Sequence, residues 1–227
     1  MGCNNTFIIG TLSKQESRAL FKELVVMNVE NYIISSIARE VTAECDGLPI
    51  AIVTVAKALK NKDMYVWLDA LQQLKRSTST NIERMHENVI SSLELSYTFL
   101  ESEAKSIFLF CSVFPEDFRI PFEVLVSYLT GLRLFKDLET IKDIRVRTHA
   151  IKSNLISSFL LIEHEKYENH VKMHDVIHDV AHMIACKHNP TFLVKAGISL
   201  EEWPQRDTFE DLTSISLMSN DIKEILK

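Results

Sequence analysis

Glycine and proline are scarce in this 227-residue chain, with five of each. An all-β protein needs many tight turns, which these two residues favour, so their scarcity indicates a mainly helical fold. The chain also lacks any apolar run near the roughly 20 residues that a membrane-spanning helix needs. Its first ten residues lack the basic and apolar regions of a signal peptide. We therefore expect a cytoplasmic protein.

Paired cysteines are absent as well. The four cysteines, Cys3, Cys45, Cys111 and Cys186, are far apart and form no CxxC motif. This pattern predicts free thiols in a reducing compartment rather than a disulfide framework. The net charge of −6 argues against a surface that attracts nucleic acid or anionic membrane uniformly, although a local basic face can still exist.

The chain has globular composition, with 46% hydrophobic and 25% charged residues, and enough length for one large domain or two small ones. Its first part begins with a helix signal. Ser13 and Glu16 form a capping box that predicts a helix over about residues 14–27. Apolar residues at helical spacing then predict a second helix over about 33–45.

Two further helices complete the pattern of residues 1–76. Gly47 suits a left-handed helix C-cap, and Pro49 suits the first turn of a third helix that is apolar on nearly every side. Asp63 can cap a fourth helix, which the polar run at 76–81 ends as a linker. The sequence thus predicts a four-helix bundle subdomain over residues 1–76.

Residues 82–190 carry helical patterns followed by a strand pattern. The helices are expected at about 87–97, 102–111, from Pro121, at 141–158 and from 176 to about 187. Short apolar runs at 160–164 and 171–174, joined by a polar stretch, predict one short β-hairpin. Helices followed by a single hairpin indicate a winged-helix subdomain over residues 82–190. The tail, 191–227, carries strand patterns at 191–194 and 214–217 and begins another, strand-based module.

Three segments of the chain resemble motifs of one protein family, in the same order. CDGLPIA at residues 45–51 resembles the GLPLA motif of plant nucleotide-binding leucine-rich-repeat receptors, with isoleucine for the second leucine. FLFCSVFPED at 108–117 and VKMHDVIHD at 171–179 are similar to the FPED-bearing and MHD motifs of the same NB-ARC region. The chain is thus identified as resembling the C-terminal part of the NB-ARC region of a coiled-coil-class disease resistance protein, over about residues 7–190. The tail resembles the entry into leucine-rich repeats.

The resemblance implies a regulatory part of an ADP/ATP-dependent switch in plant defence. It places Gly47, Leu48 and Pro49 in the pocket for the adenine base. It makes Met173, His174 and Asp175 the regulatory segment, in which His174 contacts the β-phosphate of ADP. Its expected partners are an upstream nucleotide-binding domain, downstream repeats, and further receptor copies in an oligomer formed on activation.

The phosphate-binding machinery of such a switch is missing from the sequence. There is no GxxxxGK[ST] loop, and no apolar strand ending in paired aspartates precedes Ser13. Without those amides, the lysine and the metal ligands, the chain should neither hold ADP or ATP tightly by itself nor hydrolyse ATP. We therefore expect a fragment that is not an enzyme, carries no metal, and binds nucleotide only together with the missing domain.

The sequence pattern around position 174 by itself, apart from the family resemblance, predicts a site that can bind an anion. His174 lies where a predicted strand meets a predicted helix, so its imidazole can project from a helix N-terminus. Asp175 most simply caps that helix, and its loss should weaken the positioning of His174.

Three other interpretations remain open. His174, His178 and His182 share one helix face and mimic the HExxH zinc motif, but aspartate is a methylene shorter than glutamate and no acidic third ligand is identified. Residues 139–152 have a net charge of +2, a weak basic face for a winged helix that binds nucleic acid. The bundle can also be a nucleotide-independent scaffold or adaptor, in which the phenylalanines near the second motif are simply core.

Overall fold

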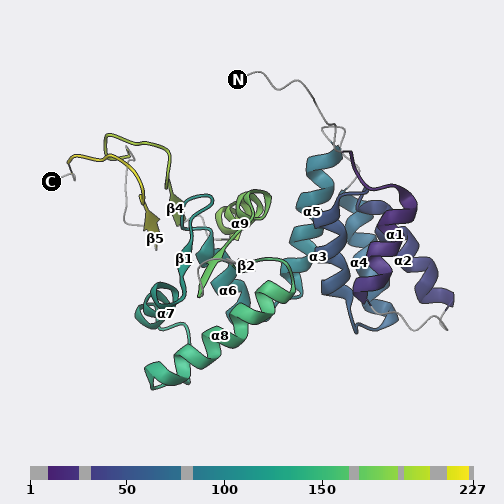
Figure 1. Cartoon of the computed structure of the whole chain (residues 1–227), viewed down its shortest axis with the longest axis horizontal. Coiled ribbons are helices and arrows are strands. Elements are labelled where there is room, and N and C mark those ends of the chain that lie inside the picture. Colours follow the sequence, from purple (N-terminus) through teal and green to yellow (C-terminus); the bar gives the residue numbers. More distant parts are fainter. Residues whose placement is uncertain are drawn as a thin grey trace. The chain divides into compact units, whose positions relative to one another are not determined.

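The computed structural model describes residues 10–25, 32–77, 84–163, 169–188, 192–204 and 214–224. It divides into two compact units, residues 1–99 and 100–227 (Figure 1). Most described residues are helical, and a small antiparallel sheet lies in the second unit. The predicted fold class, a helical bundle followed by a winged-helix-like unit, is confirmed. No described helix is both long enough and apolar enough to cross a bilayer.

Five helices form the described part of the first unit: α1 (Lys14–Val25), α2 (Tyr32–Glu44), α3 (Pro49–Leu59), α4 (Met64–Ser77) and α5 (Arg84–Thr98). The predicted linker at 76–81 lies mostly outside the described residues. The division between the units falls after Phe99, later than the boundary at 76–82 that the sequence suggested. The reason is that α5 packs against α3 and α4.

Two polar caps begin helices in this unit. The Ser13 amide donates to the Glu16 carboxylate over 2.8 Å, and the Glu16 amide donates to the Ser13 hydroxyl over 3.3 Å. These hydrogen bonds confirm the predicted capping box. Interaction of the Glu16 carboxylate with the Ser13 hydroxyl, and then with the Ser13 amide, lowers the pKa of Glu16. Asp63 caps α4, because its carboxylate accepts from the amides of Tyr65 and Val66 over 2.9 and 3.1 Å.

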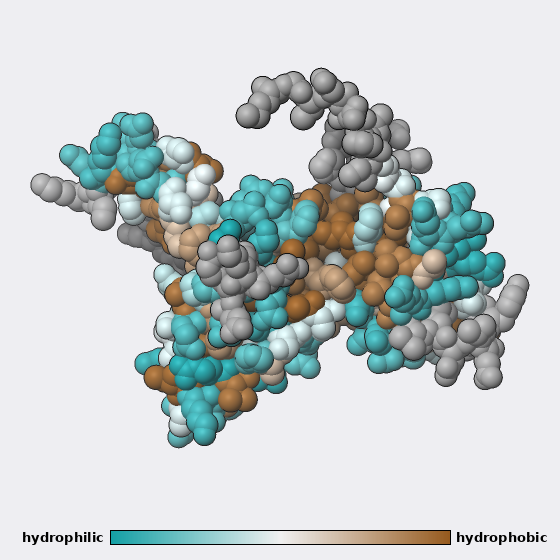
Figure 2. Space-filling model, viewed as in Figure 1, coloured by the Kyte–Doolittle hydropathy of each residue, from teal (hydrophilic) through white to brown (hydrophobic). Residues whose placement is uncertain are grey.

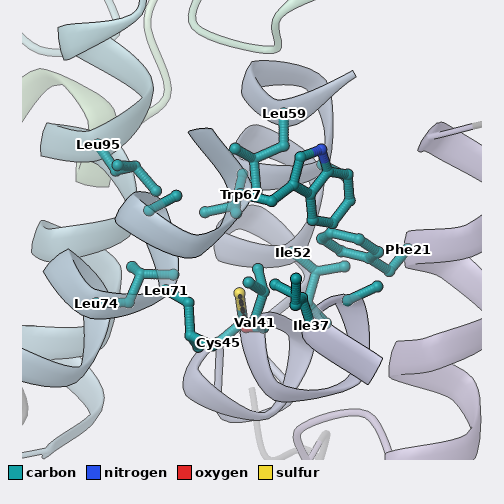
Figure 3. Packing of buried hydrophobic residues seen from close by; sticks show 14 of the residues in the cluster. Phe21, Ile37, Val41, Cys45, Ile52, Leu59, Trp67, Leu71, Leu74 and Leu95 are labelled. Carbon is teal, nitrogen blue, oxygen red and sulfur yellow. Dashed lines mark hydrogen bonds between the residues drawn. The ribbon is translucent and has the colours of Figure 1, made fainter. Parts of the chain in front are cut away.

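The core of the first unit surrounds α3. Ala51, Ile52, Val55, Ala56 and Leu59 on α3 have no exposed surface, as expected for a helix without a polar face. Trp67 of α4 meets the ring of Phe21 of α1 edge-on, with centroids 5.8 Å apart (Figure 3). Helices α1 and α5 both pack against α3.

The second unit begins with helices and closes on a small sheet. Its elements are α6 (Ser102–Cys111), β1 (Ile120–Pro121), α7 (Phe122–Gly131), α8 (Ile141–Ser157), β2 (Ile162–Glu163), β3 (His170–Lys172) and α9 (Asp175–His188). The strands form an antiparallel sheet in the order β1-β3-β2. Strands β2 and β3 confirm the predicted hairpin, whose connection at 164–168 lies outside the described residues.

Strand β1 is a correction to the sequence analysis. It pairs Ile120 with Val171 and Pro121 with His170 of β3. Pro121 therefore ends a strand and precedes α7, rather than lying inside the helix that it was expected to start. Two residues are too few to show the alternation that identifies a strand in a sequence.

The tail contains the two predicted strands, now seen as a parallel pair. These are β4 (Phe192–Val194) and β5 (Ser214–Ser216). The side chain of Asn220 joins the segments that follow them. Its oxygen accepts from the amides of Ile198 and Leu200, and its nitrogen donates to the carbonyls of Lys195 and Leu217 over 2.6 and 3.1 Å.

We expect Trp67→Ala to lower the free energy of unfolding of the first unit by about 3–5 kcal/mol, because a large buried ring leaves a cavity. Tyr65→Ala on the same helix is the matched control, since Tyr65 is 76% exposed, and should change it by less than about 0.5 kcal/mol. Urea titrations followed by far-ultraviolet circular dichroism give both values. Equal losses in the two variants would contradict the packing described for α4.

Candidate functional site

The first candidate segment is the turn between α2 and α3. Asp46 and Gly47 both have left-handed backbone conformations, with φ of 49° and 72°. The Gly47 carbonyl accepts a hydrogen bond from the Leu12 amide over 2.8 Å. A β-carbon at Gly47 would lie 2.4 Å from the Leu12 carbonyl oxygen. Both the predicted left-handed conformation and the close approach of Leu12 therefore require glycine.

Pro49 follows as the first residue of α3, as predicted, and its side chain is exposed. Leu48 precedes it in an extended conformation and is half-buried. The next apolar residues on the outer side of α3, Ile50 and Val53, are also half-buried. Figure 2 shows hydrophobic side chains reaching the surface over α3 and α5. Gly47, Leu48 and Pro49 thus lie together at a helix start with an apolar surface.

The second candidate segment is the junction between β3 and α9. Exposure alternates along it: Val171 and Met173 are buried, and Lys172 and His174 are half-buried and exposed, respectively. The His174 carbonyl accepts from the His178 amide over 2.9 Å, so His174 occupies the N-cap position of α9. Met173 is therefore anchored in the core, while His174 lies in solvent at the positive end of a helix, as predicted.

Asp175 lies in the first helical turn, as expected, but it does not cap the helix. It is the first residue of α9 and is exposed. Its carboxylate has no hydrogen-bond or ion-pair partner among the described residues, so it does not cap the helix through a side-chain hydrogen bond. An acidic group in the first turn still interacts favourably with the helix dipole.

The FPED segment fixes this junction in a way that sequence reasoning missed. The Lys172 ammonium forms an ion pair with Asp117 over 3.0 Å. The Nε2 atom of His178 lies 2.9 Å from the Phe114 carbonyl oxygen, which can only accept, so His178 donates there. These partners are 55 and 64 residues apart in the chain, beyond the reach of a local pattern.

The histidine face of α9 does not resemble a zinc site. His174 is exposed, and His178 is engaged by Phe114. Burial, and then the nearby His178, lowers the pKa of His182. Within the described ranges, no three histidine, cysteine, aspartate or glutamate side chains are placed to share a metal ion.

The basic residues of α8 are largely engaged within the second unit. Arg145 pairs with Glu123 over 2.8 Å, and Arg147 pairs with Glu103 over 2.7 Å. Lys152 is only 3% exposed and pairs with Glu163. Of the four basic residues in 139–152, Lys142 alone has no acidic partner in the described part of the chain. This arrangement leaves little free positive charge for a nucleic-acid backbone.

The two cysteines whose side chains are described are free and buried. Burial raises the pKa of the Cys45 and Cys111 thiols to about 12. Neither thiol is therefore available as a nucleophile near neutral pH.

No family model matches the chain. It is 34% identical to probable disease resistance protein At4g27220 from Arabidopsis thaliana, over 99% of this chain and 24% of that protein. It is 32% identical to the disease resistance proteins RPS5 and RFL1 of the same plant, over 99% and 100% of this chain and 26% of each relative. The chain thus spans about a quarter of the length of the curated relatives it matches.

Gly47→Ala should lower the free energy of unfolding by at least about 2 kcal/mol, because it combines left-handed strain with a collision at the Leu12 carbonyl. Gly131→Ala is the control: it ends α7, and a β-carbon there meets nothing within 4 Å. That variant should stay within about 1 kcal/mol of the parent. Chemical denaturation measures both, and a harmless Gly47→Ala would contradict the tight α2–α3 turn.

Proposed function

The chain is homologous, over nearly its whole length, to one segment of plant disease resistance proteins, and on that premise we propose that it acts in plant defence as the regulatory part of an ADP/ATP-dependent switch. In this proposal the chain is the C-terminal part of an NB-ARC region. Its role is to sense which nucleotide is bound, and it performs no chemistry of its own.

The observation that carries the proposal is the position of His174. Its side chain is exposed at the N-cap of α9, a helix of 14 residues, with the preceding Met173 buried. A helix N-terminus attracts phosphate because its first amides and its dipole both favour negative charge. His174 would add a hydrogen-bond donor for the β-phosphate of ADP.

The turn before α3 offers a second contact of complementary chemistry. Exposed Pro49 and the half-buried residues beside it form an apolar surface suited to the flat face of an adenine base. The phosphates themselves require a phosphate loop, which this sequence does not contain. We therefore assign the phosphate contacts other than that of His174 to an upstream nucleotide-binding domain, which would be the principal partner of the chain.

Switching would follow from differential contacts. ADP held by the upstream domain, Pro49 and His174 would stabilise a closed, resting arrangement of the receptor. Exchange for ATP would remove the His174 contact and favour an open arrangement that oligomerises and signals. A ligand shifts such an equilibrium only by its difference in affinity for the two states, so a single phosphate contact can matter.

The tail suits a junction with leucine-rich repeats. Strands β4 and β5 are parallel neighbours, and Asn220 bonds the backbone of both segments. Parallel strands that recur every roughly 20–29 residues, each followed by an asparagine, characterise such repeats. The downstream partner in this proposal is a repeat domain.

The main alternative is a nucleotide-independent scaffold, and calorimetric titration with ADP separates the two. We expect no measurable binding to the chain alone, and binding to the chain joined to its upstream phosphate-loop segment. His174→Ala in the longer protein should weaken binding about tenfold or more, the loss typical of a hydrogen bond to a charged group.

His149→Ala is the matched control, since His149 is also an exposed histidine but lies in the middle of α8. Its affinity for ADP should equal that of the parent. Absence of ADP binding in the longer protein would favour the scaffold. Tight binding to the short chain would indicate a self-contained nucleotide site. It would contradict the proposal that an upstream domain supplies most of the phosphate contacts.

A further inference from the structure

His178 makes one hydrogen bond through its backbone and another through its ring. The backbone amide donates to the His174 carbonyl over 2.9 Å, at the start of α9. The ring nitrogen Nε2 donates to the Phe114 carbonyl, also over 2.9 Å. His178 therefore links the backbone at His174 to the backbone of the FPED turn, residues 114–117.

The Phe114 carbonyl is a well-fixed acceptor, because the side chain of the same residue is held in the core. Phe114 is 2% exposed. Its ring stacks on Phe118 with centroids 5.4 Å apart, and meets Phe110 and Tyr128 edge-on at 5.6 and 6.2 Å. Phe110 belongs to α6 and Tyr128 to α7, so two helices hold the turn. A group bonded to this carbonyl takes its position from the core of the second unit.

A second contact joins the same turn to the strand before His174. Lys172 and Asp117 form an ion pair over 3.0 Å, but their side chains are 33% and 66% exposed. An ion pair that water reaches so easily contributes little. The hydrogen bond of His178 is partly buried and ends on a residue of the core, where it is shielded from water. Of the two contacts, that of His178 should govern the position of His174.

The position of His174 depends on the first turn of α9 staying closed. Helix ends open more readily than helix centres. Opening at this end would displace His174, whose exposed side chain has little packing of its own. His178 lies one turn into the helix, so anchoring its ring to the core restrains that opening.

We propose that His178 is the positioning residue for His174. Its ring bond to Phe114 keeps the first turn of α9 closed, so that His174 keeps the orientation suited to a phosphate. His178 itself contacts no phosphate in this arrangement, since its Nε2 proton is committed to the Phe114 carbonyl. This assignment rests on the proposed function, because His174 is the residue given there to the β-phosphate of ADP.

His178→Met and His178→Gln form a matched pair for the test. Both replacements are neutral, unbranched and similar in length, but only glutamine carries an amide that can donate to the Phe114 carbonyl. Amide hydrogen exchange, measured by NMR on the full chain without nucleotide, follows the amide at position 178. After correction for intrinsic rates, exchange there should be about fivefold faster in His178→Met, the effect of one lost hydrogen bond, and within about twofold of the parent in His178→Gln.

Calorimetric titration with ADP gives the second readout, on the chain joined to its upstream phosphate-loop segment. His178→Met should weaken ADP binding about fivefold, and His178→Gln should retain the parental affinity. His182→Met is the control, since His182 is also half-buried but lies one turn further from His174 on α9. It should leave both readouts at their parental values.

Thermal unfolding checks the fold of each variant. If His178→Met does not fold, His178→Asn replaces it, because the asparagine amide is one methylene too short to reach the Phe114 carbonyl. Equal exchange in His178→Met and His178→Gln would overturn the assignment. So would an equal effect of His182→Met, or faster exchange in His178→Met without any loss of ADP affinity. If the expected exchange pattern is found but the longer parent protein binds no ADP, the proposed function fails, while the role of His178 in holding His174 stands.

Discussion

The burial of α3 on nearly every side is the constraint on which the first unit depends. A helix without a polar face must be enclosed, so α1 and α5 both pack against it. Enclosure requires the chain to turn sharply between α2 and α3, and the Leu12 amide closes that turn on the Gly47 carbonyl. The same turn leaves Pro49 at the surface, so the exposed apolar helix start is a consequence of how the core is closed.

In the second unit, the candidate residue His174 is exposed for a different physical reason. Strand alternation buries Val171 and Met173, which forces His174 into solvent just where α9 begins. The junction is then held from outside the sheet by Asp117 through Lys172, and by Phe114 through His178. The FPED turn therefore positions His174 indirectly, by holding Lys172 before it and His178 after it. These contacts give a physical reason for the FPED and MHD motifs to occur together.

Local chemistry explains what could be predicted from the sequence. The capping box at Ser13, the left-handed Gly47 and the strand–helix junction at His174 each depend on a few adjacent residues. What could not be predicted depends on distant partners. Strand β1 forms only because it pairs with β3. Helix α5 belongs to the first unit only because it packs against α3. The missing cap at Asp175 has a local cause: the N-cap position fell one residue earlier, on His174.

The charged residues show most clearly that distant partners cannot be predicted from a local sequence pattern. By sequence, α8 carries a basic cluster, yet Arg145 and Arg147 are neutralised by glutamates 22 and 44 residues away. An overall charge of −6 does not describe this helix surface. The choice of partner depends on which charges the fold leaves unpaired, and α8 leaves few for a nucleic acid.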